Sequence, residues 1–416
     1  MGLIIRKLFR AGVAPLGSSA ARAEVTAAPA GRPDAALKLR MDAANAQSVQ
    51  PAPPDFANGD EVSVPRYAAA FTKGLPHDQN GEVDPNLYAT LLYAISAGKH
   101  ADFERISRGS GRRFVSPQAA YAFQMEGGDS HRFAAAPPPA FNSPEAAAEM
   151  NELYWQALCR DVPFAQYPES PLIQRAADSL GAKPAEVFRG PSSGDRNGPY
   201  LSQFLAKPIP LGSTVIEQRY RTPQAGNDFI TSYGEWLQIQ TGVPPWREAN
   251  WDPTPRYIRN GRDLAEWVHY DFLYQAFLNA ALIIMDARPE NVLSDRRVVL
   301  QRNNPYRQSV VQDGFVTFGF AEVVDWLGRV TTAALKAAWR QKWPIHRRLR
   351  PEEFGGRVHQ TTLSRIPFIR TCSKLRCWMR STAGPVAICS LRRTRKGCLC
   401  APRIPRGMPR PGRATW

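Results

Sequence analysis

Residues 341–356, QKWPIHRRLRPEEFGG, form the most informative stretch of this 416-residue chain. Four Lys or Arg and one His fall within its first ten residues, directly after a segment with helical spacing of apolar side chains. The helix dipole stabilises cations at a helix C-terminus, so one interpretation is a basic helix end on the surface. The other is an oxyanion site, because Arg offers a planar fork of donors and Lys a compact charge.

The surrounding sequence predicts mostly helices. Ser143 followed by Pro144 is a helix-start signal, and apolar residues then recur at one-face spacing up to about residue 160. The same periodicity predicts helices over about 86–97, 262–285 and 321–343. Alternation typical of a strand occurs over 213–220. Long stretches with turn residues separate these segments, so we expect a mainly α-helical domain, a bundle with long connecting loops.

The charge is distributed unevenly along the chain. Thirteen of the 53 Lys and Arg, and none of the 37 Asp and Glu, lie in residues 361–416, so the net charge of +16 leaves +3 for the first 360 residues. An ordinary surface balance of this kind does not indicate specific nucleic-acid binding by the body of the protein.

Cysteine follows the same division. Cys159 stands alone in the first 360 residues, and the other five of the six cysteines lie in the last 56. Cys398 and Cys400 are too close for the usual zinc spacing, and no histidine follows His359. We therefore expect no zinc site in this tail.

No targeting signal is evident in the sequence. No apolar run approaches the ~20 residues of a membrane-spanning helix. The first residues, MGLIIRKLFRAG, lack a clean apolar run after their charges, which argues against a secretory signal. The compartment is therefore not predicted.

Lys342, seven intervening residues and then Arg350-Pro351 resemble the first vanadate-binding motif of the vanadium-dependent haloperoxidases, bromoperoxidase branch. The related phosphatidic-acid phosphatases and bacterial acid phosphatases usually have six intervening residues. The resemblance extends over about residues 58–360. It is carried by 58–61 (NGDE), 71–78 (FTKGLPHD), 125–131 (MEGGDSH), 188–190 (FRG), 194–204 (GDRNGPYLSQF), 257–266 (YIRNGRDLAE), 304–307 (NPYR) and 315–319 (FVTFG).

This resemblance implies the helical bundle of the haloperoxidase and acid phosphatase type, with vanadate as cofactor. It implies that hydrogen peroxide oxidises bromide or iodide to hypohalous acid, which halogenates small organic acceptors. By the match of motif, Lys342 is the catalytic cation that polarises the bound peroxide, and Arg350 clamps the vanadate oxyanion. Calcium braces a loop in the wider family, but no residue here is assigned to it.

The sequence departs from the family downstream. The family expects histidine motifs after the Arg-Pro pair, including the apical vanadium ligand, whereas this chain has no histidine beyond His359. We therefore assign no metal ligand and expect weak vanadate binding and little or no activity. The acid-free tail is typical of a GC-rich reading frame read out of register, which predicts a truncation or frameshift after about residue 360. The expected division is a poorly ordered leader (1–57), the haloperoxidase-like domain (58–360) and the basic tail (361–416).

Several alternatives stay open at this point. A phosphomonoesterase on the same scaffold is one, because vanadate mimics phosphate. A catalytically inactive product whose tail binds nucleic acid or anionic surfaces nonspecifically is another. Apolar helix faces left uncovered by the missing segments predict aggregation or self-association. Among other candidates, His77 is expected to brace a turn, His346 to be a bystander, Asp263 and Glu266 to form an exposed acidic face, and Gly355-Gly356 to form a plain turn.

Overall fold

The computed structural model describes residues 31–118, 128–190, 193–245, 248–272, 274–286 and 303–362. It divides the chain into two compact units, Met1–Pro51 and Ala52–Trp416. In the first unit, helix α2 (Arg32–Ser48) begins after Gly31, whose φ of 87° suits a residue without a Cβ. The predicted leader thus contains a helix, and its boundary at residue 57 stays a prediction. The basic tail lies outside the described residues.

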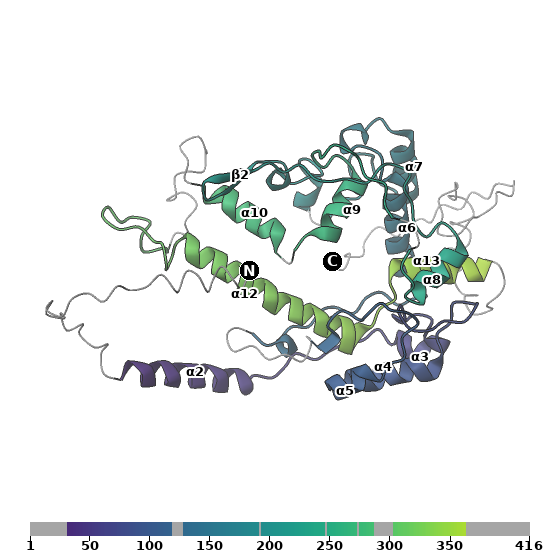
Figure 1. Ribbon diagram of the computed structural model, residues 1–416, viewed down its shortest axis with the longest axis horizontal. Coiled ribbons are helices and arrows are strands. Elements are labelled where there is room, and N and C mark those ends of the chain that lie inside the picture. The colour runs from purple at the N-terminus through teal and green to yellow at the C-terminus, as the bar shows by residue number, and fades with distance from the viewer. Residues whose placement is uncertain are drawn as a thin grey trace, which may run out of the picture. The chain divides into compact units, whose positions relative to one another are not determined.

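The second unit is mainly α-helical, as predicted (Figure 1). Its α-helices are α3 (Asp60–Ser63), α4 (Pro85–Ala97), α5 (His100–Glu104), α6 (Pro144–Cys159), α7 (Pro171–Leu180), α8 (Tyr233–Gln240), α9 (Gly261–Tyr270), α10 (Gln275–Ile284), α12 (Phe320–Arg340) and α13 (Pro351–Thr362). Short 3-10 turns lie at Pro65–Tyr67, Ser130–Arg132, Phe164–Gln166, Ser193–Arg196 and Gln203–Leu205.

Strands are short in the described part of the chain. β1 (Ile209–Leu211) pairs antiparallel with β2 (Thr214–Ile216), with Ile209 opposite Ile216. The strand predicted over 213–220 is therefore shorter than expected. The pairing ends at Ile216, opposite Ile209, the first residue of β1. Beyond it the Gln218 side chain is buried, 2% exposed, and donates to the carbonyl of Phe204 at 2.7 Å.

Helices with local start signals form where predicted. The Ser143 side chain accepts from the amide of Ala146 at the start of α6, and Asp84 accepts from Asn86 at the start of α4. The helix predicted over 262–285 is wrong as a single element, because α9 and α10 are separate. Asp271 is extended (φ −63°, ψ 150°) and ends α9. The apolar pattern runs through this break and does not reveal it.

The helix predicted over 321–343 is present, with a change of type near its end. α12 runs to Arg340 and passes into a π-helical turn, Gln341–His346, that contains Pro344. Proline has no amide hydrogen, and a wider turn accommodates its missing bond. Arg347 then takes a left-handed conformation (φ 39°) and reverses the chain into α13. Lys342 and Arg350 thus lie on either side of a sharp bend.

Two apolar clusters hold this bend in place. Trp343 of the π-helical turn packs with Leu91 and Ile95 of α4 and with Leu75. Phe354 of α13 packs with Phe141, which precedes α6, and with Met150 of α6, in the second cluster. The predicted apolar stripe of α12 is mostly not buried: within the described residues Ala338 alone is buried on this helix, and Val330 is 60% exposed.

Candidate functional site

The bend after α12 is fixed by backbone pairing with a loop distant in sequence. Ala70 and Arg348 form an antiparallel bridge. The amide of Phe71 donates to the carbonyl of Arg347 at 2.7 Å, and the amide of Leu349 donates to Ala69 at 3.2 Å. This pairing places the loop of residues 71–78 beside Arg350 and the start of α13.

Lys342 is half-buried among aromatic rings. Its Nζ lies 4.9 Å from the ring centroid of Trp339, 5.3 Å from Trp343 and 5.7 Å from Phe71. Burial, and next the positive charge of Arg350, lower the pKa of Lys342. No carboxylate or other hydrogen-bond acceptor contacts this ammonium within the residues that the structure describes. The aromatic faces offer it only a modest cation–π stabilisation.

Arg350 lies close to Lys342 and is bound on one side. Its charge acts on the Lys342 ammonium, so the two cations repel each other across the bend. The Arg350 Nε donates to Oε1 of Glu352 at 2.9 Å, and its side chain is 52% exposed. The charge of Arg350 thus acts on Lys342, while the hydrogen bond that Arg350 makes is to Glu352.

Lys73, which the motif analysis left without a role, meets the same carboxylate. Its Nζ donates to Oε1 of Glu352 at 2.8 Å, the oxygen that Arg350 also uses. Burial is the largest single influence on the pKa of Glu352 and would raise it. The charges of Lys73 and Arg350 together outweigh burial, so the pKa of Glu352 is lowered. Lys73 belongs to the FTKGLPHD segment, so its presence in a family-like motif was the available signal.

Glu353 anchors the loop of residues 71–78 from within α13. Its side chain is 1% exposed and accepts from the amide of Arg350 at 3.1 Å and from the amide of Thr72 at 3.3 Å. The first of these bonds makes Glu353 the acidic half of a capping box on α13. Burial, together with the charge of Glu352, raises the pKa of Glu353 to about 7.

His77 completes this buried polar group. Its Nδ1 donates to the carbonyl of Leu75 at 2.8 Å, so the neutral ring accepts at Nε2 from the Thr72 hydroxyl at 2.9 Å. Burial, and next the charge of Arg357, lower the pKa of His77 to about 4. The ring therefore braces the loop as expected of a turn histidine.

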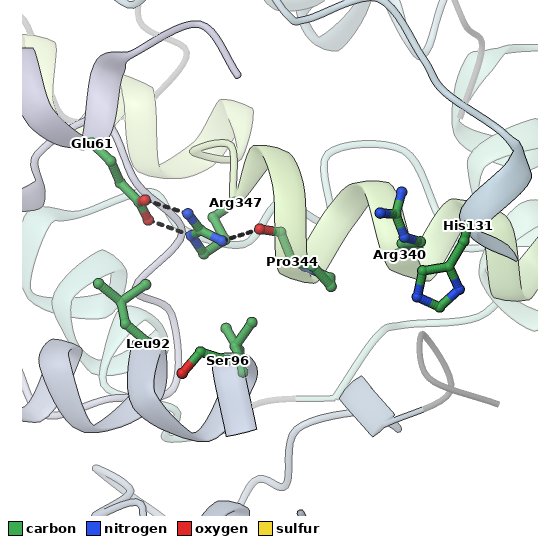
Figure 2. A pocket seen from close by; sticks show the side chains of 8 residues that line it. Glu61, Leu92, Ser96, His131, Arg340, Pro344 and Arg347 are labelled. Carbon is green, nitrogen blue, oxygen red and sulfur yellow. Dashed lines mark hydrogen bonds and ion pairs between the residues drawn. The ribbon is translucent and has the colours of Figure 1, made fainter. Parts of the chain in front are cut away.

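A hollow of about 420 Å³ lies on the other side of the bend (Figure 2). It is lined by Glu61, Leu92, Ile95, Ser96, His131, Arg340, Pro344 and Arg347. Arg347 pairs with Glu61 and donates to the Pro344 carbonyl, as Figure 2 shows, and Arg340 pairs with Asp55. Neither Lys342 nor Arg350 lines this hollow. Each of its two arginines has a carboxylate to itself, whereas Arg350 and Lys73 share one, so the arginines of the hollow are the poorer candidates for an oxyanion site.

Other sequence candidates are placed as follows. His346 is half-buried, neither ring nitrogen has a hydrogen-bond partner in the described part of the chain, and burial lowers its pKa. Asp263 is not on an exposed face as expected: it is 1% exposed, and its Oδ1 pairs with Arg256 at 3.2 Å. Gly355 and Gly356 lie inside α13 and do not form a turn.

Comparison with known proteins gives a consistent answer. A vanadium-dependent bromoperoxidase of Corallina pilulifera is 33% identical over 79% of this chain and 68% of its own length. This chain belongs to the vanadium-dependent bromoperoxidase family. A bromoperoxidase of Corallina officinalis is 32% identical with the same coverage, and one of Ascophyllum nodosum is 32% identical over 71% of this chain and 56% of its own. No family model matches the chain.

The solved structures agree on the fold of this bromoperoxidase-family chain. A homohexameric vanadate-dependent bromoperoxidase from Ascophyllum nodosum superposes with a TM-score of 0.75 at 28% identity. The match covers 91% of this chain and 66% of that protein. The predicted helical fold and family are thus confirmed, and the chain spans about two thirds of the length of these relatives.

Membrane-spanning helices and metal-binding clusters are both absent from the part of the chain that the structure describes. No helix among the described residues is long and apolar enough to cross a membrane. No group of three or more His, Cys, Asp or Glu side chains among them is arranged to hold a metal ion. The candidate site is Lys342 with Arg350, and Arg350 shares the carboxylate of Glu352 with Lys73.

Proposed function

We propose that Lys342 and Arg350 would hold the oxygens of vanadate in a site for halide oxidation by hydrogen peroxide. The observation that carries this proposal is the ammonium of Lys342, which is half-buried beside a second cation without an anionic partner among the described residues. A half-buried ammonium beside another positive charge costs free energy unless a counter-ion binds it. A small oxyanion is the ligand that such a pair fits.

Bound vanadate would supply a Lewis acid that activates hydrogen peroxide. In the overall reaction bromide, hydrogen peroxide and one proton give hypobromous acid and water. Bromide loses two electrons to the O–O bond, which breaks. The ammonium of Lys342 would donate a hydrogen bond to the peroxide and draw electron density from it, and Arg350 would hold the oxyanion in place. The rings of Trp339, Trp343 and Phe71 keep water away from the ammonium and strengthen its field.

The activity proposed for this 416-residue chain is weak. His359 is its last histidine, and that ring stacks on Tyr233 with centroids 5.4 Å apart. Vanadate would then be held by cations without the histidine ligand that the family resemblance implies. A site with fewer ligands holds its metal more weakly. We therefore propose low vanadate affinity and slow bromide turnover.

Self-association is part of the same proposal. Exposed apolar side chains gather on and beside α9 and α10: Val268, Tyr270, Phe272 and Phe277 are each at least 50% exposed. Exposed patches of this kind favour contact between protein copies. Light scattering coupled to size exclusion would show an oligomer or aggregate, and a monomer at high protein concentration would contradict this part of the proposal.

Equilibrium dialysis against vanadate tests the site directly. Lys342→Met and Arg350→Met should each weaken binding by about tenfold or more, because each removes a charge-assisted contact. Arg329→Met is the matched control: Arg329 is 50% exposed and paired within its own helix, as Arg350 is 52% exposed and paired with Glu352. Equal binding by the unaltered chain and both site variants would overturn the proposal.

Bromination of monochlorodimedone with added vanadate and peroxide tests the chemistry. The proposal expects a slow rate that vanadate stimulates and Lys342→Met removes. Fast turnover would contradict the expected impairment. Hydrolysis of p-nitrophenyl phosphate without any bromination would favour a phosphomonoesterase on this scaffold instead.

A further inference from the structure

One carboxylate oxygen joins two cations from distant parts of the chain. Glu352 Oε1 accepts from Lys73 Nζ at 2.8 Å and from Arg350 Nε at 2.9 Å. The two nitrogens therefore lie within 5.7 Å of each other, the sum of these two bonds. Lys73 and Glu352 are 30% and 18% exposed, so this contact is sheltered from solvent more than a surface pair is.

The charges in this cluster do not balance. Lys73 and Arg350 carry two positive charges against the one carboxylate, Glu352, that both contact. The charge of Arg350 also acts on Lys342 across the bend. Glu353 stands next to it but is fully buried and gives up its proton reluctantly. Two cations on one oxygen leave net positive charge at the start of α13, where the helix dipole adds to it.

Further hydrogen bonds fix the backbone around Glu352. The indole Nε1 of Trp236 donates to the carbonyl of Glu352 at 2.8 Å, and Glu353 accepts from the amides of Thr72 and Arg350. The backbone of the loop that carries Lys73 and the backbone of Arg350 are thus bound to the same buried side chain. A preorganised pair of cations loses little entropy when it binds an anion.

We propose that Lys73 is a third cation of the oxyanion site and that Glu352 is the positioning residue that holds Lys73 and Arg350 toward the anion. This inference rests on the proposed function and deepens it. The ligand class is a small tetrahedral oxyanion, with vanadate as the probe. The neutral alternative is an ion pair that only fastens the loop of residues 71–78 to α13.

Vanadate affinity by equilibrium dialysis on the full chain separates these two roles. Lys73→Met should weaken binding about tenfold, whereas Lys73→Arg, which keeps the charge, should restore most of it. Lys336→Met removes a partly buried lysine of α12 and serves as the control, with binding unchanged. Melting temperatures of all variants identify any loss that comes from unfolding.

Glu352→Gln gives a test of sign. If Glu352 were only a nearby negative charge, its removal would tighten anion binding; as a positioning residue, its loss should weaken binding several-fold. In the Lys73→Met background the further effect of Glu352→Gln should be smaller, because one of its two partners is gone.

The outcomes distinguish the inference from the proposed function. The inference alone is overturned if Lys342→Met loses binding but Lys73→Met binds vanadate as the unaltered chain does. The same holds if Lys342→Met loses binding but Glu352→Gln binds vanadate more tightly. Lys342→Met equal to the unaltered chain, or no vanadate binding by the unaltered chain, overturns the proposed function and this inference with it. Weakening in Lys342→Met, Lys73→Met and Glu352→Gln, with Lys336→Met unchanged, supports both.

Discussion

Trp236 of α8 lies directly against Gly356 of α13, so closely that a Cβ on Gly356 would overlap the indole ring, with Cζ2 at 2.0 Å. The same indole donates to the carbonyl of Glu352. One tryptophan therefore fixes both the middle and the first turn of the helix that begins next to Arg350.

This contact makes Gly356→Ala a destabilising change. Overpacking a rigid ring against a helix costs about 1–3 kcal/mol, and the shift of α13 should also weaken vanadate binding. Gly328→Ala on α12 is the control, because nothing lies within 4 Å of its added Cβ. That variant should gain about 0.5–1 kcal/mol from helix propensity. Urea unfolding of both variants checks this, and equal stabilities would contradict the packing described here.

His77 predicts how stability responds to acid. Its pKa is lowered to about 4, below the value of 6.5 for an exposed histidine, so the unfolded chain binds the extra proton first. Its contribution is fully present above pH 6.5 and is lost as the pH falls toward 4. The total is at most about 3 kcal/mol. In His77→Gln the urea midpoint should depend less on pH between these values. A pH dependence equal to that of the unaltered chain would show that the His77 ring is not buried in its neutral form.

Glu353 predicts the opposite slope. Its pKa is raised to about 7 from 4.5, so the folded chain keeps a proton that the unfolded chain has lost. Stability from this residue should be highest below pH 4.5 and should fall as the pH rises through 7. Glu353→Gln should remove this part of the pH dependence. Urea midpoints from pH 4.5 to 8 measure it, and a variant as pH-dependent as the parent would refute the burial of this acid.

Arg262 predicts a large loss of stability on substitution. Its guanidinium is 7% exposed and contacts Asp161 with two nitrogens and Asp228 at 2.7 Å. Arg262→Met leaves Asp161 without its guanidinium partner and Asp228 with Arg160 alone, and should cost about 3 kcal/mol. Arg259→Met, at a 55% exposed side chain three residues earlier, should cost less than about 1 kcal/mol. Similar thermal shifts in the two variants would be the contrary result.

The sequence predicts some elements better than others for physical reasons. α4 and α6 begin at Asp84 and Ser143, whose caps act within three residues and are visible locally. Ser170-Pro171 carries the same signal as Ser143-Pro144 and would have predicted α7. Gly355-Gly356 reads locally as a turn, yet the pair lies inside α13, where the close contact with Trp236 leaves no room for a side chain at Gly356.

The candidate site also has a part that local sequence predicts and a part that it does not. Lys342 and Arg350 are eight positions apart, and their spacing is a motif that a sequence displays. Lys73 and Glu352 are 279 positions apart, and their contact depends on the pairing of Ala70 with Arg348 across the fold. Local patterns carry no information on such pairing, so this part of the site emerges only in three dimensions.

We propose that the Lys342 ammonium and the Arg350 guanidinium face one shared anion. The most direct measurement is the pKa of Lys342, obtained from the pH dependence of its amine labelling followed by mass spectrometry. Removal of the neighbouring charge in Arg350→Met should raise this pKa, bound vanadate should raise it in the unaltered chain, and Arg329→Met should leave it unchanged. A Lys342 pKa that responds to neither Arg350→Met nor vanadate would contradict the account.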